Sequence, residues 1–331
     1  MNQIYGIDLS KEKFDVNFIT SSTKESAIVI KNSFTAINKF LVSLPKDALL
    51  CIENTGIYGE LLLFLANCFN IRISVISGYE IKHSLGLIKG KSDKIDARKI
   101  REYGERFSDK LRLAVFESEQ LHELRELYSL RAMLVKKRKM LTTHCHEKKQ
   151  SPYNSLKANK IIQEQLENLD KAIKETEEQV LYIIENTKPF NENYKLITSI
   201  VGIGPVTASE LIIKTNNFVK INTARKAASF AGICPFPNAS GKMVKKSKIS
   251  PMADKSLKTL LYLCASSAVL YNKEYKQYYN KKKMEGKHHY LIMNNVSSKL
   301  LRTVYSIIHS RAKYDPNYIC LDPRQKEKKI A

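Results

Sequence analysis

The chain has 331 residues, with 55 Lys and Arg against 33 Asp and Glu, so its formal net charge is +22. A field of this sign and size favours a polyanionic partner, above all nucleic acid. The chain has no apolar run near 18 residues, no signal peptide and no lipidation motif, which disfavours a membrane protein. Its six cysteines form no C-x-x-C pair. We therefore expect reduced thiols and a cytoplasmic, nucleoid-associated bacterial protein.

The first hundred residues predict alternating strands and helices. β-rich or continuous apolar runs predict strands at 3–10, 13–20, 26–32, 47–54 and 71–77, and the tight connections between the first three indicate an antiparallel meander. Helical spacing predicts helices at 33–44, with Ser33 as N-cap, at 58–70, and in a later segment that includes Asp93 and Asp96. The order β-β-β-α-β-α-β-α is that of a ribonuclease-H-like α/β domain, which we assign to residues 1–112.

The next part of the chain is almost wholly helical. An approximate heptad spacing, interrupted by Thr176, joins six apolar residues: Ile162, Leu166, Leu169, Ile173, Val180 and Ile184. This spacing predicts a paired coiled coil, within one chain or between protomers. We assign it to a connector at 113–188, with Pro152 at the hairpin between two long helices.

A second compact unit is expected at 189–312. It is predicted to be helical, apart from an irregular segment rich in Gly and Pro at 232–251. The remaining residues, 313–331, form a basic tail that we expect to be disordered.

In the ribonuclease-H-like arrangement the first strand lies at the sheet centre beside the fourth, and four acidic residues fall where this would bring them together. Asp8 lies on the first strand, Glu53 ends the fourth, and Asp93 and Asp96 stand one helical turn apart. Each alone has an ordinary explanation: a turn, a strand end, a helix cap or a solvated face. Together they predict a site for two Mg²⁺ ions, because clustered carboxylates repel one another unless cations join them.

Two motifs of the second unit suggest phosphate contacts. The stretch 195–214 predicts a helix–hairpin–helix in which Gly202 and Gly204 let the backbone approach a phosphate, although a simple turn between two helices has the same pattern. Ser240-Gly241 is followed by four lysines: Lys242, Lys245, Lys246 and Lys248. A serine among cations suits either a nucleophile or a phosphate-binding loop, and the residues leave that choice open.

Three blocks near the N-terminus resemble the signatures of the DEDD-type transposases of insertion-sequence family one hundred and ten. They are "IYGIDLSKEKFDV", "CIENTGIYGELL" and "GKSDKIDARKI", and "FAGICPFPNASGK" followed by "ISPMADKSLKTLL" is similar to the family's C-terminal domain. The resemblance implies a RuvC-like N-terminal domain whose metal-binding, catalytic carboxylates are Asp8, Glu53, Asp93 and Asp96, with Mg²⁺ or Mn²⁺ as cofactor. It also implies that Ser240 is a catalytic nucleophile that forms a phosphoserine link to DNA.

The same resemblance implies the partners. They are the DNA of the insertion-sequence ends and the target, a bridge RNA that pairs with both, and further copies of the chain in a dimer or tetramer. The chain departs from the family pattern at Pro251-Met252-Ala253 and at Leu257-Lys258. We still expect Ser250 and Pro251 to serve there as N-cap and first residue of a helix.

We expect the helix from Lys255 on to continue into 271–290, where tyrosines alternate with lysines. Tyr271, Tyr275, Tyr278 and Tyr279 suit stacking on bases, although a solvated helix end with a few packed tyrosines has the same composition.

The leading interpretation is a DNA transposase. The first alternative is a metal-dependent, structure-specific RuvC-like nuclease that uses water as its nucleophile. A sugar-kinase-like protein would share "YGIDLS" but would need glycine-rich phosphate loops that the chain lacks. A protein that binds nucleic acid without catalysis is the third alternative.

Overall fold

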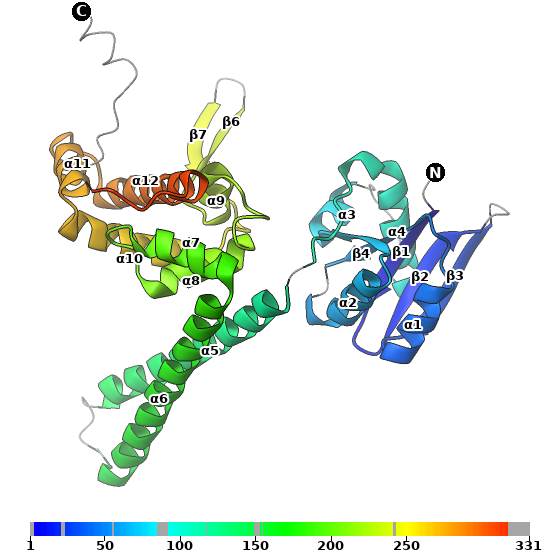
Figure 1. The fold of residues 1–331 in the computed structure, drawn as a ribbon, viewed down its shortest axis with the longest axis horizontal. Helices are drawn as coiled ribbons and strands as arrows, with labels where there is room; N and C mark the ends of the chain where they lie inside the picture. Colours follow the sequence, from blue (N-terminus) through cyan, green and yellow to red (C-terminus); the bar gives the residue numbers. More distant parts are fainter. Residues whose placement is uncertain are drawn as a thin grey trace, which may run out of the picture. The chain divides into compact units, whose positions relative to one another are not determined.

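The computed structural model describes residues 3–316 except 21–23, 55, 85–91, 117, 149–152, 154 and 241–242, and the side chains at 237–246 are not described. The chain forms two compact units, Met1–Phe116 and Glu117–Ala331 (Figure 1). The two long helices discussed below belong to the second of these units. A finer division of that unit into a connector and a transposase domain remains a prediction.

A five-stranded mixed sheet forms the centre of the first unit. Its strands are β1 (Gln3–Leu9), β2 (Lys13–Ile19), β3 (Glu25–Lys31), β4 (Ala48–Glu53) and β5 (Arg72–Ile76). They lie in the order β3-β2-β1-β4-β5, with β1, β2 and β3 antiparallel and β4 and β5 parallel to β1. This is the predicted ribonuclease-H-like order, and β1 lies beside β4 as expected.

Helices cover both faces of this sheet. The first face packs against α1 (Phe34–Val42) and α2 (Glu60–Cys68), and Tyr5, Ile7 and Leu9 belong to that core. The second packs against α4 (Asp93–Arg106) and its neighbour α3 (Gly78–Ser84) in a smaller core with Ile4. Because strand side chains alternate between faces, Gly6 and Asp8 share the α4 side with Ile4. Two short 3₁₀ turns follow β4 and α4, at Gly56–Gly59 and Ser108–Lys110.

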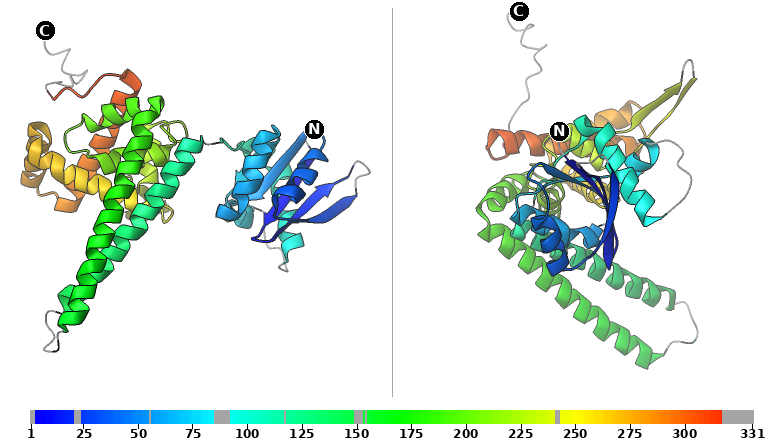
Figure 2. Two further views of the ribbon diagram at one scale, coloured as in Figure 1. Left: turned by 60° about the horizontal axis from the view of Figure 1, so that its bottom comes forward. Right: turned by 90° about the vertical axis from the view of Figure 1, so that its right-hand side faces the viewer.

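Two long helices, α5 (Glu119–Lys148) and α6 (Leu156–Asn186), lie side by side as an antiparallel pair (Figures 1 and 2). The six residues of the predicted apolar series are all buried or half-buried. Two ion pairs join the helices: Arg131 to Glu177 at 2.6 Å, and Arg138 to Asp170. The predicted hairpin residue Pro152 lies outside the described residues, and classification of the pair as a coiled coil remains a prediction.

The rest of the second unit is mainly helical around one apolar core. Its helices are α7 (Lys188–Thr198), α8 (Pro205–Thr215), α9 (Ala224–Phe230), α10 (Lys255–Tyr271), α11 (Lys273–Met284) and α12 (His289–Ser310). Among the described residues, no helix is both long and apolar enough to cross a membrane.

The segment predicted to be irregular, 232–251, instead contains an antiparallel hairpin of β6 (Phe236–Ser240) and β7 (Met243–Lys248). The pairing shifts register between Phe236 and Asn238. Pro237 lies at this shift, and since proline has no N–H to donate to a ladder, it favours such an irregularity. Strand β6 therefore accommodates Pro237 at an irregularity in the ladder.

Two helix boundaries also differ from the predictions. Helix α10 begins at Lys255, because the Asp254 carboxylate accepts from the N–H of Leu257 at 2.9 Å, whereas Ser250 only accepts from Met252 in the preceding turn. The helix then ends at Asn272, whose side chain caps α11 by accepting from Glu274 and Tyr275. Carboxylate and amide oxygens at these positions satisfy the free N–H groups of a first turn.

Candidate active site

Asp8 lies near the carboxyl end of β1, on the face that α4 covers. On β2, the residue that pairs with Asp8 is Asp15, which is only 4% exposed. On β4, the neighbouring strand on the other side of β1, Ile52 pairs with Ile7, so the next residue, Glu53, lies beside Asp8. Residues directly opposite in a sheet project from the same face. Three carboxylates from three adjacent strands therefore share this part of the sheet.

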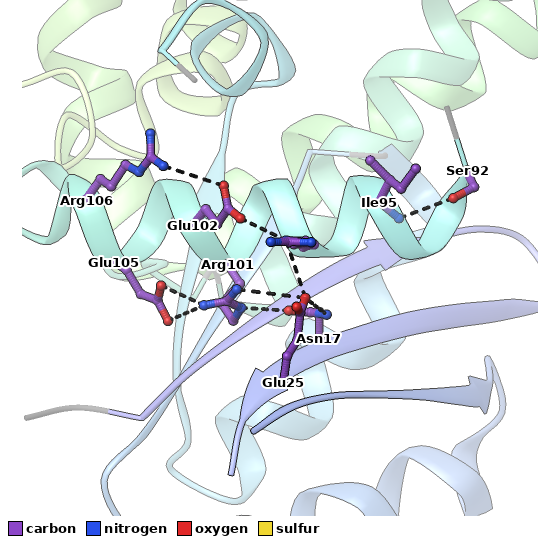
Figure 3. A network of polar contacts seen from close by, with 9 residues as sticks. Asn17, Glu25, Ser92, Ile95, Arg101, Glu102, Glu105 and Arg106 are labelled. Carbon is purple, nitrogen blue, oxygen red and sulfur yellow. Dashed lines mark hydrogen bonds and ion pairs between the residues drawn. The ribbon is translucent and has the colours of Figure 1, made fainter. Parts of the chain in front are cut away.

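Helix α4 brings two more carboxylates to the same end of the sheet. Asp93 and Asp96 both lie in its first turn, and Ser92 caps the helix by accepting from the N–H of Ile95 (Figure 3). The helix crosses β1 in direct contact at Gly6, where a Cβ atom would lie 2.2 Å from the carbonyl oxygen of Ala97. Only glycine permits this approach, which places the start of α4 beside Asp8.

Burial and the acidic surroundings together raise the pKa of Asp8 to about 6. Burial is the largest cause, followed by the charges of Asp96, Glu53, Asp93 and Asp15. Both effects disfavour the ionised form. The four predicted site carboxylates are thus brought into one electrostatic cluster, and Asp15 is a fifth member that sequence reasoning missed.

We expect the metal-free protein to lose stability as the pH rises through the folded-state pKa of Asp8. A raised pKa contributes stability that is complete below the usual value of 3.8 and is lost as the pH rises to about 6 and above. Asp8→Asn should therefore raise the free energy of unfolding by roughly 1–3 kcal/mol at pH 7.5 and have little effect near pH 3.5. Denaturant unfolding with chelator across this range measures the difference, and a difference independent of pH would contradict the explanation.

A buried arginine fixes α4 to the sheet (Figure 3). Arg101 is 5% exposed; its Nε donates to the side-chain oxygen of Asn17 on β2 at 2.6 Å, and its Nη1 donates to both oxygens of Glu105 at 2.6 Å. The amide of Asn17 in turn donates to Glu25 on β3 at 3.0 Å, and Glu25 also pairs with Arg98 at 3.4 Å. The network ties the helix that carries Asp93 and Asp96 to β2 and β3.

Replacing Arg101 by Met should destabilise the first unit by about 1–3 kcal/mol, because it leaves the buried side-chain oxygen of Asn17 without its hydrogen-bond donor. Thermal or denaturant unfolding measures this loss. Arg106→Met is a suitable control. Arg106 is exposed, and its ion pair with Glu102 is long, at 3.8 Å, so losing it should cost little. Equal stability of the two variants would show that the buried network does not anchor α4.

Two lysines bind the acidic cluster in this structure. Lys13 lies 3.3 Å from Asp93 and 3.6 Å from Asp15, and Lys99 lies 2.8 Å from Asp96. Neither lysine, nor Asp15, was singled out from the sequence. The sequence did contain a signal for them: Lys13 and Asp15 stand two residues apart on the strand that pairs with β1, so both side chains lie on the same face of the sheet as Asp8.

The donor set suits a hard divalent cation, since all its members offer carboxylate oxygens. Within the described part of the chain, however, no three His, Cys, Asp or Glu side chains lie close enough together to hold one ion. Binding an ion here would require Asp93 and Asp96 to exchange their ammonium partners for the metal.

The predicted serine and lysines belong to the second unit. Ser240 is the last residue of β6 and pairs with Met243, and Lys245, Lys246 and Lys248 lie on β7. Lys248 is exposed, whereas the side chains of Ser240, Lys245 and Lys246 and the whole of Lys242 lie outside what the structure describes.

The two glycines of the predicted helix–hairpin–helix differ in their surroundings. Gly202 has a φ of +100°, and a Cβ there would lie 2.9 Å from the backbone nitrogen of Ala268 in α10. This glycine is therefore required by packing within the unit. Gly204 is exposed, precedes Pro205 at the start of α8, and has open space around it. Of the pair, only Gly204 leaves room for a ligand.

The tyrosines of the 271–290 segment also differ. Tyr275 is 5% exposed and bonds to Thr303, so its predicted stacking on bases is wrong. The Lys299 ammonium lies 4.2 Å from the centre of the half-buried Tyr278 ring. Tyr271 is 78% exposed and remains available for stacking.

A ribonuclease-H-like domain with acidic residues around its first strand, joined in one chain to a basic helical unit, suits an enzyme that acts on the phosphodiester backbone of nucleic acid. Comparison with known families identifies which one. A transposase model of the DEDD type from IS110 elements matches residues 5–148, and a model described as "Transposase IS116/IS110/IS902 family" matches residues 194–280. The chain belongs to this family of insertion-sequence transposases and is a DNA transposase/recombinase.

Individual relatives agree with the family. Pilin gene-inverting proteins of Moraxella lacunata and Moraxella bovis are each 24% identical over 327 residues, covering 95% of this chain and 98% of theirs. An uncharacterized 44.8 kDa protein of insertion element IS116 from Streptomyces clavuligerus is 24% identical over 152 residues, or 46% of this chain and 37% of its own.

A solved RuvC structure from Thermus thermophilus matches 34% of this chain and 99% of its own, with 12% identity and a TM-score of 0.26. The ribonuclease-H-like assignment rests on the strand order and not on this match.

Proposed function

We propose that the protein cuts and rejoins DNA strands during insertion-sequence transposition, using Asp8, Glu53, Asp93 and Asp96 to bind divalent metal and Ser240 as nucleophile. The convergence of acidic residues from β1, β4 and α4 on Asp8, with its raised pKa, carries the metal-binding part. Bound Mg²⁺ or Mn²⁺ would supply positive charge to the phosphodiester at the reacting phosphorus. The carboxylates would hold and orient it.

In the proposed strand transfer, the hydroxyl oxygen of Ser240 attacks phosphorus and loses its proton. A new O–P bond forms as the bond from phosphorus to the neighbouring nucleotide's oxygen breaks. The departing oxygen takes up a proton and becomes a DNA hydroxyl, and a phosphoserine link remains. Attack by a DNA hydroxyl on the same phosphorus reverses the exchange and returns the proton to serine. Because Ser240 and the carboxylates lie in different units, the two must meet in one protomer or across a homo-oligomer.

The alternative is a RuvC-like nuclease with water as nucleophile. The relatives' name, pilin gene-inverting protein, favours recombination, because inverting a gene requires rejoining as well as cutting. We extend the proposal to a bridge RNA as guide, on the strength of the family membership and the +22 charge.

Trapping a covalent intermediate on the wild-type protein tests the proposed function. A nicked DNA substrate that loses its leaving strand should leave a protein–DNA species that resists denaturation and forms only with Mg²⁺ or Mn²⁺. Cleaved DNA with no such species would favour the water-dependent nuclease. Cleavage that continues in excess chelator would remove the metal from the mechanism.

We also expect nucleic-acid affinity to fall steeply with salt, since each phosphate contact releases counterions. Neutralising Lys245 and Lys246 together should weaken binding and reduce the slope of log K against log salt by about two. Fluorescence anisotropy from low to physiological salt measures the slope. Neutralising Lys171 and Lys174, both well exposed on α6, is the matched control, and an equal change there would show that the β7 lysines make no special contact.

A further inference from the structure

Glu53 and Gly78 come into close contact at the carboxyl edge of the sheet. Glu53 ends β4 and pairs with Ile76, the last residue of β5, and Gly78 begins α3 two residues later. A Cβ atom on Gly78 would lie 2.1 Å from Oε1 of Glu53 and 3.1 Å from its Cδ. The carboxylate of Glu53 thus occupies the space that any other residue at position 78 would fill.

The backbone gives no other reason for glycine at this position. The glycines with positive φ in the described chain are Gly56, Gly202, Gly232 and Gly286, so Gly78 has a conformation that other residues also adopt. Gly78 is moreover the first residue of α3, whereas helices favour glycine at the position after their last residue. A glycine that neither the backbone conformation nor the helix requires is explained by what touches it, which is Glu53.

We propose that Gly78 is a positioning residue of the active site, which holds the Glu53 carboxylate in place by having no side chain. The proposal rests on the proposed role of Glu53 in metal binding. Gly6 makes an instructive contrast. A Cβ there would meet the backbone of α4, at the oxygen of Ala97 and the nitrogen of Arg101, whereas a Cβ on Gly78 would meet the movable end of a side chain.

Different outcomes are therefore expected at the two glycines. Backbone atoms cannot swing aside, so Gly6→Ala should displace α4 and lower stability. The Glu53 side chain can rotate, so Gly78→Ala should leave the fold intact and move only the carboxylate. Gly78 is consequently the position at which placement of the carboxylate can be separated from folding.

The experiment measures Mn²⁺ binding by electron paramagnetic resonance, and thermal unfolding in chelator, on the full chain. Gly78→Ala should bind Mn²⁺ about 10–100-fold more weakly, as expected when a metal ligand loses its support, with an unfolding temperature equal to or above that of the wild type. The matched control is Ser84→Ala, an exposed position on the same helix, which should behave as the wild type. Wild-type Mn²⁺ affinity in Gly78→Ala would overturn the proposal.

A double-mutant cycle shows whether the effect passes through Glu53. Glu53→Asp withdraws the carboxylate by one methylene group, so adding Gly78→Ala to it should change Mn²⁺ affinity less than twofold, because coupled residues are not additive. An equal loss in both backgrounds would overturn the positioning role. Glu53→Gln separates the two proposals. Wild-type Mn²⁺ binding and DNA cleavage by Glu53→Gln would refute the role of Glu53 in the metal site. Weakened Mn²⁺ binding by Glu53→Gln together with wild-type binding by Gly78→Ala would refute only the positioning role of Gly78.

Discussion

Asp8→Ala is expected to abolish DNA strand cleavage, with a rate at least about a thousandfold below that of the wild type. Asp8 is the residue around which the other carboxylates gather, as the causes of its raised pKa show. Without it, the proposed metal site would lose the carboxylate contributed by β1. Glu53→Ala should have a similar effect, because it removes the carboxylate contributed by β4. Single-turnover cleavage of labelled DNA with Mg²⁺ measures both rates.

Loss of activity must be distinguished from loss of folding. Asp47 provides the control: it is exposed and lies just before β4, at the opposite edge of the sheet from Glu53, so Asp47→Ala should cleave normally. Both active-site variants should unfold at or above the wild-type temperature in chelator, since each removes a repelling charge. Near-normal cleavage by Asp8→Ala would exclude the carboxylate cluster from catalysis.

Ser240→Ala is expected to retain DNA binding and metal binding but to lose recombination and every covalent protein–DNA species. Removing a nucleophile costs a rate factor of at least about a thousandfold in enzymes that form covalent intermediates. The loss of recombination rate in Ser240→Ala should exceed the loss caused by replacing any neighbouring serine with alanine. Ser247 on β7 and Ser250 in the following turn are the matched controls, and both alanine variants should keep part of the activity.

Mapping the DNA-linked peptide decides which residue is the nucleophile. An adduct at Ser240 in the wild type, absent from Ser240→Ala, would establish the serine. An adduct on another residue, or normal recombination by Ser240→Ala, would exclude it. If Ser240 is excluded, its proposed role would be reduced to contacting phosphate from a basic hairpin. The absence of any covalent adduct would then favour the nuclease that uses water as its nucleophile.

Much of the first unit could be predicted from the sequence because its signals are local. The continuous apolar run before Glu53 identified a central strand, and β-rich runs separated by short turns gave the antiparallel order of β1, β2 and β3. The β6–β7 hairpin was missed because Pro237 and the nearby glycine read as irregular structure. The break at Asn272 was missed because it depends on one side chain that bonds two backbone N–H groups.

The site was only partly predictable, for a physical reason. Chain order indicated that Asp8, Glu53, Asp93 and Asp96 could converge, and the structure brings them into one electrostatic cluster. The residues around it make contacts between distant segments: Arg101 bonds to Asn17, which is 84 positions away in the sequence, and Gly78 lies against the side chain of Glu53. No periodicity or composition signals such pairs, so they emerge only from the coordinates.

The paired helices α5 and α6 have an uneven distribution of buried side chains. Full burial is confined to one end of the pair, at Leu121 and Leu124 on α5 and from Thr176 to Ile184 on α6. Toward the other end, Ile162 and Leu166 are only half covered and Ile161 is 61% exposed. Local opening costs least where few apolar contacts are lost. Backbone amides should therefore exchange with solvent hydrogen progressively faster from Ile184 toward Ile162. A binding partner that covered the end of the pair near Ile162 would slow the exchange of the amides at that end most.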